Sequence, residues 1–274
     1  MLPQDGAGRL VVCPTPIGNL GDVTLRGLEA LREADAIACE DTRRTKVLLD
    51  RYEIAGKLVS FHEHNETTRA LELAGRIEGG GVIVLVSDAG TPLVSDPGYA
   101  LVRTCLERGL PIEVLPGPSS VTTALVASGL PAERWRFVGF LPRKRGELER
   151  MLGESEETLV AFESPGRLAG TLAVLAGLES ERPVVVCREL TKLHEEVRRG
   201  TAAELAAYYD DHPPRGEVVL VVGPAAPGSM AREEALAALR ALVEAGARAR
   251  PAAATVAKLT GVSTNELYKS WTDS

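Results

Sequence analysis

Aromatic residues are scarce in this sequence, and long apolar runs are missing from it. Phe, Trp and Tyr make up 4% of its 274 residues, so aliphatic side chains must fill whatever cores the chain builds. No apolar run approaches the roughly 18–20 residues that are needed to cross a bilayer, so we expect no membrane partner. The first residues, MLPQDGAGRL, do not combine a basic region with an apolar stretch, and we expect no signal peptide.

The chain also lacks an excess of positive charge. It has 38 acidic and 31 basic residues, which gives a net charge of −7. Such a balance disfavours a protein that wraps duplex nucleic acid through bulk charge, and we expect no DNA partner. It leaves room for local basic patches that contact RNA.

Paired cysteines and the common nucleotide-binding motifs are absent as well. Cys13, Cys39, Cys105 and Cys187 lie far apart, without CxxC or Cys/His metal spacing. We interpret them as buried or semi-buried free thiols of a cytoplasmic protein. No GxGxxG follows the first expected strand and no GxxxxGK[ST] occurs, which disfavours a classical dinucleotide site and a P-loop.

Residues 9–115 repeat one unit, in which a short Val/Ile/Leu-rich run is followed by turn residues and then by a segment of helical period. Runs of this kind are typical of strands that are buried on both faces of a parallel sheet. The expected strands are Arg9–Cys13, Asp35–Cys39, Lys57–Phe61, Val82–Val86 and Ile112–Leu115. The expected helices are Thr24–Glu33, Thr42–Arg51, Thr67–Glu78 and Tyr99–Arg108. The alternation predicts an α/β lobe with a mostly parallel, doubly wound sheet over residues 1–115.

A second α/β lobe is expected over residues 116–224, opening with a connection (116–131) that contains a helix. Its strands are Arg136–Phe140, Thr158–Phe162, Pro183–Cys187, Glu195–Gly200 and Glu217–Val222, and its helices include Gly166–Leu178 and Ala202–Tyr209. Thr201 and Glu204 predict a capping box, and Ser164-Pro165 predicts an N-cap followed by a first-turn proline. Because Arg188–Gly200 can form a hairpin, we expect a mixed sheet.

Residues 225–274 are expected to form a small helical appendage. AAPGSM (225–230) is typical of a linker, and Arg232–Ala245 has a helical period. Residues 252–271 then suggest a helix, a Gly-containing turn and a second helix, which resembles a helix-turn-helix. The appendage is either a solvated helical hairpin docked on the main body or a contact for RNA.

Three loops at the carboxyl ends of the first lobe's strands contain the motifs that most strongly indicate a binding site. They are PTPIGNL (14–20), SDAGTPLVSDPG (87–98) and PGPSS (116–120). Ligands of open α/β sheets bind at this edge. Small residues let a ligand approach the backbone closely, and the helix start after Pro118 suits a carboxylate or a phosphate. Each loop has an alternative interpretation as a plain strand-to-helix turn.

Charged side chains follow two further strands at the same edge, in EDTRR (40–44) and HEHN (62–65). They are interpreted as a polar wall facing a substrate, with plain helix capping and a His62/His64 metal site as alternatives. A basic cluster of Arg134, Arg136, Arg143, Lys144 and Arg145 surrounds Phe137 and Phe140. It is either a solvated face or a contact for RNA phosphates.

Together these motifs resemble the tetrapyrrole methylase superfamily, the class III S-adenosylmethionine methyltransferases, in the branch that methylates a cytidine 2′-hydroxyl of 16S ribosomal RNA. The matching pieces also include GFLPRK (139–144), FESPGR (162–167), REL and TK (188–192) and GEVVLVV (216–222), in order over roughly residues 9–222. The sequence departs from the branch at Phe162, where Tyr is frequent, and at Ser120, where Ala is common.

The resemblance implies two α/β lobes with S-adenosylmethionine in the cleft between them, a homodimer, and 16S rRNA of the small ribosomal subunit as partner. The residues it assigns to the cofactor wall are Pro14, Ser87, Asp88, Ala89, Gly90, Pro92, Ser119, Ser120, Phe162, Leu190 and Glu217. Aspartates suit the cationic groups of that cofactor, in agreement with the motif analysis. No metal is implied.

Methyl transfer to a ribose hydroxyl requires alignment and a group that takes the proton. The expected catalytic residues are Glu40, Asp41, Arg43, His62, Asn65 and Lys192, and His64, Glu163 and Glu189 are further candidates for the base. We favour a base from the Glu40–Asp41 and His62–Asn65 edge, with Arg43 or Lys192 orienting a phosphate or the hydroxyl. The acidic balance suggests an assembled ribosomal particle as the substrate.

Two other functions fit parts of the sequence. A precorrin or porphyrinoid C-methyltransferase of the same superfamily would share the cofactor loops, but EDTR, HEHN and the C-terminal appendage speak against it. A non-catalytic RNA-binding module would explain the basic cluster and the appendage, but it has no need of the loop at residues 87–98.

Overall fold

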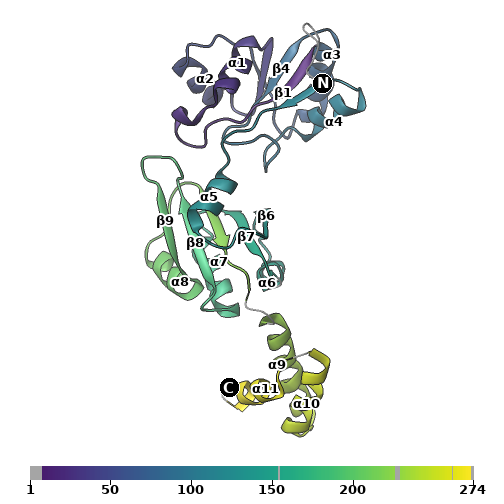
Figure 1. The fold of residues 1–274 in the computed structure, drawn as a ribbon, viewed down its shortest axis with the longest axis vertical. Coiled ribbons are helices and arrows are strands. Elements are labelled where there is room, and N and C mark those ends of the chain that lie inside the picture. Colours follow the sequence, from purple (N-terminus) through teal and green to yellow (C-terminus); the bar gives the residue numbers. More distant parts are fainter. Residues whose placement is uncertain (1–7, 154, 226–228, 261, 273–274) are drawn as a thin grey trace. The chain divides into compact units, whose positions relative to one another are not determined.

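The computed structural model describes residues 8–153, 155–225, 229–260 and 262–272, with the side chains of residues 229–233 left aside (Figure 1). The chain divides into two compact units. The first comprises residues 1–127 and 187–196, and the second comprises residues 128–186 and 197–274. Within the described ranges, no helix has the length and apolarity that crossing a membrane requires.

The first unit is built on a five-stranded sheet in which every pairing is parallel, as predicted. The strand order is β3-β2-β4-β1-β5. The strands are β1 (Arg9–Val12), β2 (Ala36–Cys39), β3 (Leu58–Ser60), β4 (Val82–Leu85) and β5 (Ile112–Val114). Each lies within its predicted range and is one or two residues shorter.

Helices cover both faces of this sheet and form three layers with it (Figure 1). They are α1 (Leu25–Glu33), α2 (Thr42–Arg51), α3 (Glu66–Glu78) and α4 (Tyr99–Glu107), with a 3-10 turn at Leu20–Asp22. Alternate strand side chains point to opposite faces, so Leu10 packs with α3 and α4 while Val11 packs with α1 and α2. Burial on both faces explains why the inner strands β2 and β4 and all of β1 after Arg9 are apolar.

The four cysteines are free and buried, as the spacing predicted. Burial raises the pKa of the Cys13 thiol to about 12 and that of Cys105 to about 11. Both thiols are therefore protonated at neutral pH and act as small apolar groups.

The second sheet has the order β6-β7-β10-β8-β9. Its strands are β6 (Trp135–Phe140), β7 (Thr158–Glu163), β8 (Pro183–Arg188), β9 (Glu196–Thr201) and β10 (Val218–Val222). The sheet is mixed, as predicted, because β6 runs parallel to β7 and β10 runs antiparallel to it. The neighbouring positions of β8 and β9 agree with the expected hairpin.

One face of this sheet packs against three helices, α6 (Arg145–Gly153), α7 (Leu168–Leu178) and α8 (Ala202–Asp211). The Thr201–Glu204 capping box of α8 is confirmed. The N-cap predicted at Ser164 is wrong, because α7 starts only at Leu168 and Arg167 holds the cap position. Helix α6 was not predicted, since four of its nine residues are charged and two are glycines.

Helix α5 (Ser120–Ser128) is the helix expected inside the 116–131 connection. At the C-terminus, α9 (Ser229–Glu244), α10 (Ala249–Thr260) and α11 (Thr264–Thr272) pack around a small core that contains Leu239, Val256 and Leu267. The predicted linker is too long at its end, because Ser229 and Met230 already belong to α9. Residues 226–228 of that linker and Gly261 of the predicted turn lie outside the described residues.

Candidate functional site

The loops that follow the five strands of the first sheet lie at its carboxyl edge, because all of its strands point the same way. Direct contacts join the loops after β1, β2, β4 and β5. Thr15 and Gly90 exchange two backbone hydrogen bonds of 2.9 and 3.0 Å, which tie the loop after β1 to the loop after β4. The Thr15 hydroxyl also donates to the Ser87 carbonyl oxygen at 2.9 Å. The PTP turn and the start of the 87–98 loop therefore form one rigid unit.

The 87–98 loop keeps an unusual backbone. Gly90 and Gly98 have φ values of 82° and 141°, and Leu93 and Ser95 have φ values of 72° and 65°. The left-handed region is costly for residues other than glycine, and such conformations concentrate at binding sites. The Ser87 hydroxyl donates to the Gly90 carbonyl oxygen at 3.0 Å and closes the first turn of the loop.

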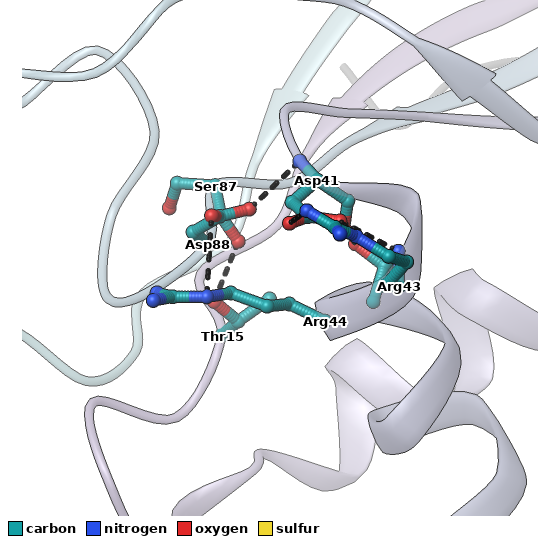
Figure 2. Close-up of polar contacts among 7 residues, drawn as sticks. Thr15, Asp41, Arg43, Arg44, Ser87 and Asp88 are labelled. Atoms are coloured by element: carbon teal, nitrogen blue, oxygen red, sulfur yellow. Dashed lines mark hydrogen bonds and ion pairs between the residues drawn. The ribbon is translucent and has the colours of Figure 1, made fainter.

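The Asp88 side chain connects this loop with the EDTR segment after β2 (Figure 2). One carboxylate oxygen accepts a hydrogen bond from the Asp41 backbone N–H at 2.9 Å, and the other lies 3.7 Å from the Arg44 Nε. The Asp88 side chain keeps 19% of its surface exposed. A carboxylate held in this way presents a fixed negative charge at the edge of the sheet.

The PGPSS segment packs against the same group of loops. A side chain at Gly117 would have its Cβ 2.7 Å from the Pro14 Cβ, so only glycine allows this approach. The Thr91 hydroxyl donates to the Pro118 carbonyl oxygen at 3.2 Å. Ser119 and Ser120 then open α5, whose first backbone N–H groups lack helical partners and suit an anionic group.

The segment before β9 closes on the PTPIGN turn. A Cβ at Gly18 would lie 2.8 Å from the Leu190 carbonyl oxygen and 2.4 Å from the Lys192 side chain. Glu189 and Thr191 both have positive φ values, 51° and 65°. The Lys192 ammonium donates to the Glu189 carboxylate at 2.8 Å, so a nearby acid already neutralises its charge.

Between these segments lies a pocket of about 420 Å³. Ile17 and Pro118 give it apolar walls, and Asp22, Thr123 and Thr191 supply polar ones. None of these three polar residues was predicted as a site residue, although Asp22 closely follows PTPIGNL and Thr191 lies in the TK piece.

Glu40 and Asp41 differ sharply in proton affinity. The pKa of Glu40 is raised, first by burial and then by the negative charge of Asp88. The pKa of Asp41 is lowered to about 2, first by the hydrogen bond from the Arg43 side chain. Asp41 also caps α2 by accepting from the Arg43 backbone N–H at 2.8 Å. Glu40 therefore takes up a proton more readily than its neighbour.

The His62 ring is fixed by Asn65. The Asn65 carboxamide oxygen accepts from the His62 backbone N–H at 3.0 Å, and its nitrogen donates to the Ser60 carbonyl oxygen at 3.2 Å. These contacts set the amide orientation, so its nitrogen faces the His62 Nε2 at 3.1 Å and donates to it. The neutral imidazole thus has its proton on Nδ1, which is buried without a partner among the described residues.

Glu163 is unsuited to the role of base. Its carboxylate is fully buried and accepts from the Ser164 backbone N–H and the Thr171 hydroxyl, both at 2.7 Å, with the Arg167 guanidinium at 3.2 Å. It stabilises the turn before α7.

The alternative of a metal site at His62 and His64 has no support in the described part of the chain, which places no group of three or more His, Cys, Asp or Glu side chains where they could hold an ion.

The predicted site residues divide between the two units. Most belong to the first unit, and the contacts above bring the β1, β2, β4 and β5 loops together. Phe162 on β7 and Glu217, just before β10, belong to the second unit, and their place in the cofactor wall stays a prediction. Thr15 and Arg44 were missed as site residues. Their only signal was their position inside PTPIGNL and EDTRR.

Comparison with known proteins agrees with these motifs. Residues 9–206 match the family model for tetrapyrrole (corrin/porphyrin) methylases. A protein of Mesorhizobium japonicum, called ribosomal RNA small subunit methyltransferase I, is 46% identical over 95% of this chain and 90% of its own. Its namesake in Escherichia coli O157:H7 is 44% identical over 97% of this chain and 95% of its own.

Solved structures agree on the fold. Uroporphyrin-III C-methyltransferase of Thermus thermophilus has a TM-score of 0.56 at 23% identity, covering 79% of this chain and 94% of its own. A cobalt precorrin-4 methyltransferase has a TM-score of 0.60 at 18% identity, covering 81% of this chain and 98% of its own. The chain belongs to the tetrapyrrole methylases and, among them, to the ribosomal RNA small subunit methyltransferase I family.

Proposed function

We propose that this protein transfers the methyl group of S-adenosylmethionine to the 2′-hydroxyl of a cytidine in 16S ribosomal RNA. The observation that carries the proposal is the 87–98 loop, which Thr15 ties to the PTPIGNL turn and Asp88 ties to EDTR. A cofactor loop and a charged wall are thus locked together at one edge. The names of the relatives at 44–46% identity supply the class of substrate.

The residues at this edge fit the proposed cofactor. Asp88 offers a negative charge to its cationic amino and sulfonium groups, and the start of α5 offers backbone donors to its carboxylate. Gly90 and Gly117 leave the backbone open to close approach. When bound, S-adenosylmethionine supplies an electrophilic methyl group, and the protein has to align the hydroxyl and exclude water.

We infer that Glu40 is the general base among the candidates. Asp41 is a weak base, because the hydrogen bond from Arg43 keeps its pKa near 2. The His62 Nε2 already accepts a hydrogen bond from Asn65. Glu40 is accessible to solvent as a residue, and partial burial of its carboxyl group and the nearby Asp88 charge raise its pKa, which favours uptake of the hydroxyl proton.

Replacing Glu40 with Gln is expected to lower kcat by roughly 10²–10⁴-fold, the usual contribution of a general base. Cofactor affinity, measured by calorimetry, should stay within about twofold. The wild-type rate should rise with pH as Glu40 deprotonates, and this dependence should be absent in the variant. Glu29→Gln, an exposed carboxylate on α1, is the matched control, and an E40Q rate equal to that of E29Q would exclude Glu40.

The proposal includes a homodimer in the cytoplasm and a small ribosomal subunit as the physical substrate. A protein with a net charge of −7 has little overall electrostatic attraction to protein-free RNA. An assembled ribosomal particle, which carries its own proteins, is therefore the better partner. Methylation of protein-free 16S rRNA at the same rate as 30S subunits would contradict this part.

Tritiated methyl transfer onto 30S subunits from a strain that lacks the enzyme tests the whole proposal. Nuclease digestion and nucleoside analysis should recover the label in 2′-O-methylcytidine. Label on a base would refute the ribose assignment, and transfer to a porphyrinoid instead of RNA would favour the C-methyltransferase alternative. Absence of S-adenosylmethionine binding in calorimetry would favour a non-catalytic binding module.

A further inference from the structure

The edge strand β6 concentrates aromatic side chains in a chain that has few. The protein contains four Phe and two Trp residues, and Trp135, Phe137 and Phe140 all lie in the six residues of β6. Phe162 lies next to them on β7. Since β6 is paired only with β7 in the strand order, no strand among the described residues lies beside its outer edge.

A bulge in β6 places two of these rings on one face. Phe137 is in register with Val160 and Phe140 with Phe162, so β6 has one residue more than β7 between the two pairs. Gly139 accommodates the bulge with a φ of 67°. Without the extra residue, Phe137 and Phe140 would point to opposite faces. With it, both rings meet Phe162 edge-on, at centroid distances of 5.0 and 5.4 Å.

This aromatic face is open at the edge of the sheet. Val138 packs against the core on the side of α6, α7 and α8, whereas Phe137 and Phe140 lie on the other side. Phe140 exposes 63% of its surface and Trp135 exposes 37%. Phe140, which is held against the Phe162 ring, and the neighbouring Trp135 form an exposed platform on which other flat groups can stack.

Positive charge surrounds the platform. Between residues 133 and 145 there are five Lys or Arg residues and one acidic residue, although acidic residues are in excess over the whole chain. Arg136, Lys144 and Arg145 are each paired with a glutamate. The exposed Arg134 and Arg143 side chains form no ion pair with any residue that the structure describes.

We propose that the β6 edge binds a single-stranded segment of the RNA substrate, with bases stacked on Phe140 and Trp135 and phosphates paired with Arg134 and Arg143. The inference rests on the proposed function for the identity of the RNA. Single-stranded RNA is recognised by this combination of aromatic rings and cationic side chains. A second copy of the chain fits less well, because a symmetric contact would place the two identical basic patches against each other and their positive charges would repel.

The test is the affinity of the full-length protein for a fluorescein-labelled, 12-nucleotide single-stranded RNA and for 30S subunits. Phe140→Ala should weaken both by about tenfold, the loss of one stacked base. Leu106→Ala is the matched control, because Leu106 is 65% exposed on α4, and it should change neither. In a Trp271→Phe background, Trp135 is the remaining tryptophan, and RNA should quench its fluorescence.

Salt dependence tests the phosphate contacts. Arg134→Ala and Arg143→Ala should each reduce the slope of log affinity against log salt by about 0.7, the value for one phosphate of a single strand. Arg32→Ala, an exposed arginine on α1, should leave the slope unchanged.

RNA affinities of F140A equal to those of L106A would overturn the inference. So would a change in molar mass by light scattering without a change in RNA affinity, since the edge would then be an interface between copies. A loss of S-adenosylmethionine affinity alone would also overturn it, because Phe140 would then act through Phe162. Failure of the proposed function would instead appear in the wild type, as absence of methyl transfer to 30S subunits.

Discussion

Replacing Asp88 with Asn is expected to weaken S-adenosylmethionine binding by roughly 100-fold while the fold is kept. The Asn side chain still offers an oxygen to the Asp41 backbone N–H, which Asp88 holds at 2.9 Å, but it removes the negative charge. A hydrogen bond to a charged group contributes about 1.5–3 kcal/mol, which corresponds to roughly 10–100-fold in affinity, and the lost attraction to the cationic cofactor adds to this.

Calorimetry with S-adenosylmethionine and S-adenosylhomocysteine measures this effect. The loss should be greater for the cationic S-adenosylmethionine than for S-adenosylhomocysteine, which lacks the sulfonium charge. Asp88→Ala should also lower the melting temperature, because the Asp41 N–H then loses its acceptor. Asp35→Asn is a close control, since Asp35 likewise accepts from a backbone amide, that of Val82 at 2.7 Å, at the start of β4. Equal affinities of D88N and D35N would show that Asp88 is only structural.

The largest loss of stability is expected at Arg182. Its side chain is 1% exposed, and its guanidinium donates to the carbonyl oxygens of Gly223 at 2.8 Å, Ser155 at 3.2 Å and Leu152. The Glu179 carboxylate lies 3.9 Å away. This one side chain therefore joins the end of α6, the segment before β7 and the end of β10.

Arg182→Met should lower the free energy of unfolding of the second unit by about 3–5 kcal/mol, because three buried carbonyl groups lose their donor. Urea titration followed by tryptophan fluorescence reports on this unit, since Trp135 and Trp271 both belong to it. Arg150→Met, which changes an exposed arginine on α6, should change stability by less than about 0.5 kcal/mol. A loss for R182M no greater than for R150M would refute the network.

Much of the fold follows from local sequence patterns. The Val/Ile/Leu-rich runs of the first unit could be assigned to parallel strands because burial of the inner strands on both faces leaves no polar alternation. Helix α2 was predicted to the residue, since Asp41 caps its start. Helix α6 was missed because only two of its residues, Leu148 and Leu152, are buried, and two apolar positions are too few to indicate a packed helix face.

The sequence also indicated which loops make up the candidate site, because the loops that follow parallel strands lie at one edge of the sheet. It did not indicate which residues of these loops contact one another. Asp88 and Asp41 are 47 residues apart, and nothing local indicates that a carboxylate of one loop meets a backbone amide of another. Glu163 likewise looked available as a base, until packing placed Thr171 and Arg167 around its carboxylate.

By itself, the sequence determined most of the strands and helices in chain order, the loops of the candidate site and, through its motifs, the family. These depend on properties that short segments carry, such as apolar periodicity, caps and turn residues. Only the tertiary structure decided that Asp41 and Glu163 are held by arginine side chains, that Asn65 faces the His62 Nε2, and that a bulge turns Phe140 to the same face as Phe137. Those outcomes depend on contacts between segments far apart in the chain, and such contacts exist only once the sheets and helices have packed.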